Sequence, residues 1–216
     1  MKKLSHSFIL WLLFIATLSL LSYSPPKRIP FCGFSIKNGF FYDNYAREYI
    51  TKEASLGDKS GIPDIVDKIE KTLNFNVEIA VYLAKNENNC WATTGQGGKR
   101  LLVTDVDFLD EVNTVSGTKW AAISVIAHEV GHHIAGFGRH PNQLDDELDA
   151  DYWSGYTLEK LGASKNASTK CIMQFGTEED TQSHPNKYSR ANIIKKGWDD
   201  ALNNTIDYSK CENCKP

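Results

Sequence analysis

The chain has 216 residues, of which 41% are hydrophobic and 24% are charged, and its formal net charge is −3. This length and composition predict one globular domain, with appendages, that buries a core of ordinary size. The weak negative net charge gives no electrostatic reason to expect a nucleic-acid partner, so none is predicted.

The first 24 residues have the pattern of an export signal. Two lysines near the start precede an apolar run from Phe8 to Leu21, which falls short of the roughly 20 residues that span a bilayer. We predict that residues 1–24 are a signal peptide or N-terminal anchor and that the protein is exported, either to the periplasm or out of the cell. Small residues end the segment but two prolines follow directly, so cleavage and retention as an anchor over residues 8–23 both remain open. Membrane association is expected through this segment only.

The next stretch leads from a linker into the domain. Residues 25–44 mix proline, glycine and aromatic residues without periodicity, as linkers do. The domain is expected over residues 45–204, beginning with a short helix at Tyr45–Glu53. From Ile62 to Leu73 apolar residues recur with the helical period, and a proline lies in the first turn, where its missing N–H does no harm. This stretch is predicted to be an amphipathic helix that packs on the core.

Three β-prone stretches follow. Val77–Leu83 alternates apolar and polar residues, and two further stretches, Cys90–Thr94 and Arg100–Thr104, flank a glycine-rich turn. The turn predicts a hairpin, and the sheet is expected to be small and antiparallel. The glycines are not a phosphate loop, since the Gly-Lys-Ser/Thr ending is missing.

The rest of the domain is predicted to be helical. An apolar helix is expected from Gly117 or Thr118 to Ala135, where glycines and a proline break it. The following helix has acids in its first turn and ends at a glycine, the charge order that a helix dipole favours. The later helices complete an α+β fold that is mostly helical, with the small sheet placed before the apolar helix. After the break, helices are expected at Asp145–Leu161 and at Ser168–Phe175, and the segment Ser183–Arg190 leads into a final helix through Trp198.

Five cysteines follow the signal, and in an exported chain they predict disulfides rather than a second metal site. An odd number leaves at least one thiol free or paired with another molecule. Cys211 and Cys214 have the spacing of a redox pair but lie in the terminal tail, residues 205–216, with no strand or helix around them. We favour a staple that ties this tail to Cys32.

The apolar helix carries the motif His128-Glu129-Val-Gly-His132. Residues four apart lie on one face of a helix, so the two imidazoles can bind one metal ion while Glu129 lies beside it as a general base. An apolar helix would bury these polar groups at a cost unless they have a partner, and a cation is the simplest partner.

A catalytic zinc site normally takes a third protein ligand, and several residues compete for this place. His133 points about 100° away from the ligand face, and His140 stands two positions too late for the pattern with a third histidine. The acidic helix offers Glu147 and Asp151, which lie four residues apart on one face. Two histidines and a carboxylate also suit Fe(II), but the helical spacing and Glu129 favour one Zn²⁺ ion.

Together, the two histidines and the segment from Glu147 to Asp151 resemble the M48-type zinc metallopeptidases, also called gluzincins, from roughly Cys90 to Trp198. The resemblance implies a zincin-like metallopeptidase domain. It makes Glu147 the third zinc ligand and gives Asp151 the role of holding a ligating histidine through its other nitrogen.

The resemblance extends to two later residues and to the hairpin. Ser183-His184-Pro, followed by Arg190, is similar to a segment of soluble relatives in which the histidine lies near the metal; a structural role at the helix start stays open for His184. Three roles stay open for Arg190: contact with a substrate carbonyl, stabilisation of the oxyanion, and a bridge between helices. The hairpin strand implies an edge that receives a substrate chain as an added strand. The multiple spanning helices of membrane members are missing, so a prenylated substrate is not expected, and the short spacing from His132 to Glu147 leaves little room for a cover over the cleft.

The function predicted from these residues is that of an exported zinc-dependent metalloendopeptidase with Glu129 as general base. Its substrates would be peptides or unfolded and misassembled proteins of the cell envelope. Two alternatives remain. One is a zinc amidase or peptidoglycan hydrolase, and the other is a noncatalytic, metal-stabilised binding or chaperone-like envelope protein with His184 plugging the metal.

Overall fold

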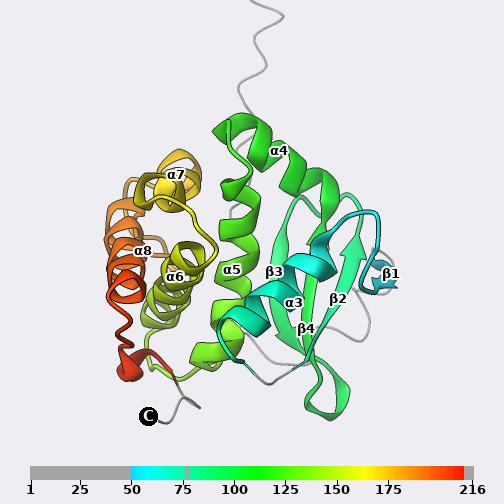
Figure 1. Cartoon of the computed structure of the whole chain (residues 1–216), viewed down its shortest axis with the longest axis horizontal. Coiled ribbons are helices and arrows are strands. Elements are labelled where there is room, and N and C mark those ends of the chain that lie inside the picture. The colour runs from blue at the N-terminus through cyan, green and yellow to red at the C-terminus, as the bar shows by residue number, and fades with distance from the viewer. Residues whose placement is uncertain (1–49, 76–77, 212–216) are drawn as a thin grey trace, which may run out of the picture.

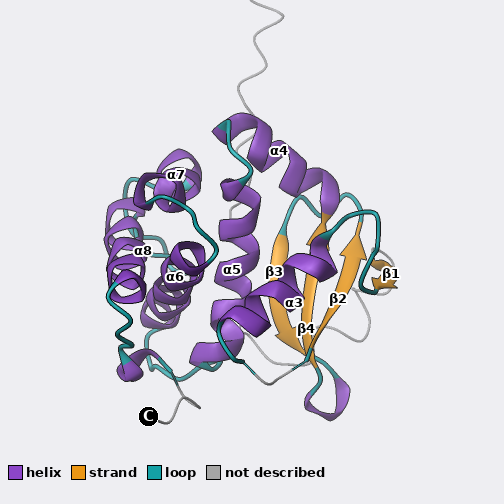
Figure 2. Cartoon of the chain, in the orientation of Figure 1, coloured by secondary structure: helices purple, strands orange, loops and turns teal. Residues whose placement is uncertain are grey.

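The computed structural model describes residues 50–75 and 78–211. Within them the fold is α+β, as expected, with six α-helices and one four-stranded sheet (Figure 2). Helix α5 (Trp120–Ala135) stands in the middle, with the sheet on one side and helices α6 to α8 on the other (Figure 1). The predicted signal or anchor and the linker lie outside the described residues. No helix in the described ranges combines the length and the apolar character needed to cross a membrane.

The sheet has the strand order β1-β2-β4-β3, so β1 and β3 are its edges. The predicted hairpin is confirmed, because β3 pairs antiparallel with β4. β2 and β4 pair in parallel, however, so the expectation of an antiparallel sheet is wrong for this pair. The chain runs along β3 at the edge before β4 returns between β3 and β2. The four strands are β1 (Ile50–Ala54), β2 (Ile79–Ala84), β3 (Cys90–Thr94) and β4 (Arg100–Asp105).

The prediction of a helix over Tyr45–Glu53 is wrong for the residues that the structure describes. Residues 50–54 form β1, which pairs antiparallel with β2, and residues 45–49 lie outside the described part. Across these strands the Tyr82 hydroxyl donates to the Glu53 carboxylate at 2.9 Å. A pairing partner about 30 residues away outweighs the weak local preference of a short segment, as is usual for strands.

Two helices accompany the sheet and contact α5. The predicted amphipathic helix is confirmed as α3 (Ile62–Thr72). Helix α4 (Val106–Ser116) was not predicted, although its signals are present in the sequence. Asp105 caps it by accepting a hydrogen bond from the Asp107 N–H at 3.1 Å, and Gly117 ends it with φ 63°.

The helical side confirms the three helices predicted after the break, with shifted ends. They are α6 (Gln143–Lys160), α7 (Lys165–Phe175) and α8 (Lys187–Leu202). Each begins after a polar side chain that accepts hydrogen bonds from its first turn, as N-caps do. Helix α6 packs against both α5 and α8, so it joins the centre of the molecule to its outer helical layer (Figure 1). The three caps are Asn142, Ser164 and Asn186.

The expectation that the cysteines form disulfides is only partly correct. Cys90 on β3 and Cys171 on α7 are free and buried. Burial raises the pKa of the Cys171 thiol to about 12, so this thiol stays protonated at neutral pH. Cys211 is disulfide-bonded, and the expected pairing with Cys32 lies outside the described residues.

Candidate metal centre

Helix α5 buries the two histidines and the glutamate of the motif. The side chains of His128, Glu129 and His132 are 2%, 1% and 1% exposed. The helix is buried along nearly its whole length because the sheet side and the helical side both pack on it. The rings of His128 and His132 lie with their centroids 4.7 Å apart, as the four-residue spacing predicts. Such burial of three ionisable groups needs partners from other elements.

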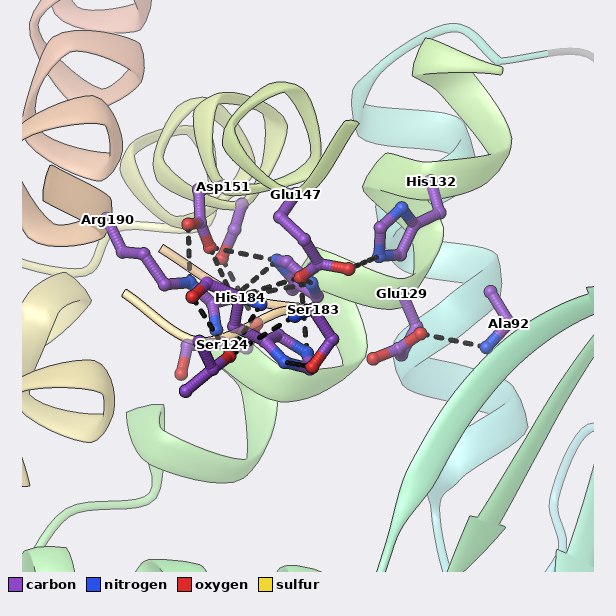
Figure 3. Close-up of polar contacts among 12 residues, drawn as sticks. Ala92, Ser124, Glu129, His132, Glu147, Asp151, Ser183, His184 and Arg190 are labelled. Carbon is purple, nitrogen blue, oxygen red and sulfur yellow. Dashed lines mark hydrogen bonds and ion pairs between the residues drawn. The ribbon is translucent and has the colours of Figure 1, made fainter. Parts of the chain in front are cut away.

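Helix α6 supplies the carboxylate that completes a ligand group. Glu147 is fully buried, and its oxygens lie 3.3 Å from His128 Nε2 and 3.6 Å from His132 Nε2 (Figure 3). Among the described residues these three form the one group of histidine, cysteine and acidic side chains close enough to hold a metal ion. The expected ligands therefore come together although Glu147 follows His132 by 15 positions in the sequence.

The geometry of this group fits a small metal ion. Ligand atoms about 2.0–2.1 Å from one tetrahedral ion lie about 3.3 Å from each other, which is close to the observed separations. Neither oxygen of Glu147 has a hydrogen-bond partner among the described residues, although a buried carboxylate normally accepts several such bonds. A cation between the imidazole nitrogens and the carboxylate would satisfy both oxygens.

Asp151 lies one turn after Glu147 on α6 and contacts the far side of the His128 ring. Its Oδ1 is 2.9 Å from His128 Nδ1, so the protonated Nδ1 donates to the carboxylate and Nε2 faces Glu147. This is the position that the resemblance implies for Asp151. The contact fixes both the ring orientation and the nitrogen that is available to an ion.

Arg190 on α8 continues this chain of contacts. Its Nε and Nη2 donate to the two oxygens of Asp151 at 2.7 and 2.9 Å, in a bidentate pair (Figure 3). Burial would raise the pKa of Asp151, but Arg190 and His128 hold it well below its usual range. Arg190 is itself only 2% exposed. Arg190 therefore bridges α8 and α6. Its burial does not support the contact with substrate that the sequence left open.

Glu129 turns from the ligand group towards the sheet. Its Oε2 accepts a hydrogen bond from the backbone N–H of Ala92 on the edge strand β3, at 2.8 Å. Figure 3 shows the carboxylate between Ala92 and the cluster around Glu147. The carboxylate that the sequence predicts as a general base therefore lies between the edge strand and the metal group.

The loop between α7 and α8 brings His184 to the same cluster. His184 Nε2 lies 3.6 Å from Glu147 Oε2, and its Nδ1 is 2.8 Å from the Ser183 hydroxyl. The loop is held by the Thr181 hydroxyl, which accepts the His184 N–H at 2.9 Å. His184 therefore lies near the metal group, as expected, although it is not one of the three residues that form this group.

Burial and nearby charge give the two ligand histidines opposite protonation in the metal-free protein. Burial lowers the pKa of both rings, but at His128 the Asp151 carboxylate outweighs it and raises the pKa to about 9. At His132 burial prevails and lowers the pKa to about 3. Burial would raise the pKa of Glu147, but the histidines and Arg190 lower it to about 2, so this carboxylate is charged.

The other histidine candidates have different partners. His133 is buried with its Nε2 3.0 Å from the Leu101 carbonyl oxygen, which confirms it as a packed neighbour that ties α5 to β4. His140 Nε2 lies 2.8 Å from Asp149 Oδ2, away from the ligand group. The sequence offered no signal for the Ala92 backbone N–H, since nearly every residue type supplies such a group. Ser183 belonged to the predicted Ser183-His184-Pro segment, but its hydrogen bond with His184 was not predicted.

The arrangement combines a buried three-residue metal group, a carboxylate beside it and an edge strand next to that carboxylate. Such a group can hold one divalent ion and can place a proton acceptor next to it. No protein-family model, curated protein or solved structure matches this chain.

Proposed function

We propose that this protein is a zinc-dependent metalloendopeptidase of the zincin-like, M48-type class. The observation that carries the proposal is the buried group of His128, His132 and Glu147, with Glu129 next in sequence to the first ligand. Zinc is favoured over Fe(II) because a three-residue site with an adjacent carboxylate base is the arrangement of zinc hydrolases.

The chemistry divides between the ion and the residues around it. When bound, zinc would acidify a water ligand and polarise the carbonyl to be cleaved. Glu129 would take the proton from the water and pass it to the leaving amine. Asp151 would hold the His128 ring in place, and Arg190 would neutralise Asp151 through hydrogen bonds to both of its oxygens.

The substrate would approach along the edge strand β3. The Ala92 N–H is directed outward from the sheet, to Glu129, so this face of the strand adjoins the metal group. A peptide pairing with such an edge would bring its backbone next to the base, which suits unfolded or misassembled envelope proteins of an exported enzyme. The same water chemistry would also serve a zinc amidase that acts on cell-wall peptides.

One observation favours a second candidate function. His184 Nε2 lies 3.6 Å from Glu147 Oε2 and has no hydrogen-bond partner among the described residues. As a fourth ligand it would close the metal site, and a closed site suits a noncatalytic, metal-stabilised binding protein. In that case the zinc-loaded protein would cleave no peptide bond, and Glu129 would have no catalytic role.

The replacement of Glu129 by Gln tests the leading proposal. It keeps the shape of the side chain but removes the proton acceptor, so zinc should stay bound while hydrolysis of unfolded protein falls about 10²-fold or more. Glu70→Gln is a matched control, because Glu70 is also a helix carboxylate that accepts a strand N–H, from Ile79 at 2.9 Å.

Zinc content and the cleavage of a casein-type substrate, with and without chelator, are the measurements. Loss of zinc from Glu129→Gln, or full activity without the carboxylate, would overturn the assigned role. If the zinc-loaded wild-type protein is inactive, His184→Ala distinguishes a plugged enzyme, which becomes active, from the noncatalytic candidate, which does not. Digestion of cell-wall glycopeptide in the same series identifies the amidase alternative.

A further inference from the structure

Gly131, between the two histidines of the motif, lies at the closest approach of α5 and α6. A Cβ atom placed on Gly131 would be 2.6 Å from the Ala150 carbonyl oxygen and 3.0 Å from the Ala150 Cα. Both neighbours are backbone atoms of α6, so neither can turn aside as a side chain would. Glycine therefore allows a backbone approach that no other residue permits here.

This contact lies at the level of the metal group on both helices. On α5 it falls next to His132 and one turn after His128. On α6 Ala150 stands between Glu147 and Asp151, the ligand and the residue that supports His128. Any change in the separation at Gly131 is thus passed directly to the distance between the two imidazoles and the carboxylate.

The size of the effect can be compared with the tolerance of a metal site. Ordinary contact begins at 3.4 Å, so a methyl group at 2.6 Å requires the helices to separate by up to 0.8 Å at this point. Metal–ligand distances tolerate changes of only about 0.2 Å. The separation exceeds this tolerance several-fold, and Glu147, which is fully buried, has little free volume in which to extend.

We infer that Gly131 is a positioning residue that sets the α5–α6 separation at which Glu147 can share an ion with His128 and His132. The inference rests on the proposed metal site. It gives the glycine of the motif a role distinct from helix formation, for which glycine is a poorer choice than alanine.

Gly131→Ala in the full chain provides the test, with zinc affinity measured by competition with a chromogenic chelator. Alanine is the better helix former, so an effect through helix propensity alone would raise the free energy of unfolding. If Gly131 instead sets the α5–α6 separation, the alanine variant should bind zinc about ten-fold or more weakly. Gly61→Ala is the control. Gly61 has φ 67°, a backbone conformation that strains alanine, and it precedes α3, away from the ligand helices.

The expected result is a lower unfolding free energy in both variants and weaker zinc binding in Gly131→Ala alone. Equal zinc affinity in Gly131→Ala and the wild type would overturn the inference. If Gly131→Ala does not fold in plain buffer, its zinc affinity is measured in trimethylamine N-oxide, an osmolyte that favours the folded state, and an affinity equal to that of the wild type there would overturn it equally. Failure of the wild-type protein to bind zinc would contradict the proposed function instead, so the two failures are distinguishable.

Discussion

At the scale of single residues, the site is a buried chain of charge and hydrogen bonds. Arg190 binds Asp151 through two hydrogen bonds, Asp151 holds His128, and His128 faces Glu147. Each of these groups would be costly to bury alone, and each is compensated by the next. The chain ends at the Glu147 oxygens, which lie 3.3 and 3.6 Å from the two imidazoles and make no hydrogen bond with the described residues. This is the point at which a cation would complete it.

The proton on His128 gives a prediction about metal binding. With its pKa raised to about 9, His128 is protonated at pH 8 in the metal-free protein, and zinc can bind the ring only after that proton leaves. Zinc affinity should therefore rise with pH up to about 9, about ten-fold per unit from this group, and binding at pH 8 should release a proton from His128.

Calorimetry in two buffers of different ionisation enthalpy measures this release. Asp151→Asn removes the carboxylate that raises the pKa of His128, so the variant should release distinctly less than the wild-type protein at pH 8. A contribution from the water ligand is common to both proteins and cancels in the comparison. The same proton count in both would show that Asp151 does not keep His128 charged.

At the scale of elements, local pattern predicted the helices well and the sheet less well. The helical period over Ile62–Leu73 and the apolar run ending at Ala135 were sufficient for α3 and α5. The pairing of β1 with β2 and the parallel pairing of β2 with β4 depend on partners far along the chain, which no local window contains. Helix α4 has both caps and an apolar face and could have been predicted from them.

The site was predictable to the extent that it depends on helical spacing and on motif. Two histidines four residues apart had to share a face, and the acidic helix was expected to bring Glu147 to them. The crossing of α5 and α6 that makes this possible depends on the Gly131 contact, which becomes visible only in three dimensions. The hydrogen bond from the Ala92 N–H to Glu129 is equally invisible in sequence, because it needs only a backbone group at the right place.

The start of α8 gives a prediction at this scale. The Asn186 side chain accepts hydrogen bonds from the N–H groups of Tyr188 and Ser189 at 3.1 and 3.0 Å, and Arg190 follows in the next residue. Asn186→Ala should lower the free energy of unfolding by about 1 kcal/mol, as the loss of an N-cap does. Because the cap orders the turn that carries Arg190, zinc affinity should fall as well.

Urea unfolding and zinc titration measure the two effects. Ser164→Ala is the control, since Ser164 caps α7 through the Ala167 N–H at 3.2 Å and contacts none of the metal group. It should lose a similar free energy of unfolding and keep its zinc affinity. Equal zinc affinities in all three proteins would mean that the α8 cap does not support the site.

At the scale of the whole molecule, the metal group lies where the two sides of the fold meet on α5. The sheet side contributes Ala92 at the edge strand, and the helical side contributes Glu147, Asp151, His184 and Arg190. An ion bound here would join α5 to α6 at the centre of the molecule (Figure 1). The placement also brings Glu129 to the β3 edge, along which we propose that an extended peptide substrate binds.

The metal content of the purified full chain, measured by elemental analysis, tests this site most directly. We predict about one zinc per chain in the wild-type protein and in His140→Ala, whose histidine contacts Asp149 instead, and almost none in Glu147→Ala. A wild-type protein without metal, or a Glu147→Ala variant that keeps its full zinc content, would contradict the metal centre of His128, His132 and Glu147.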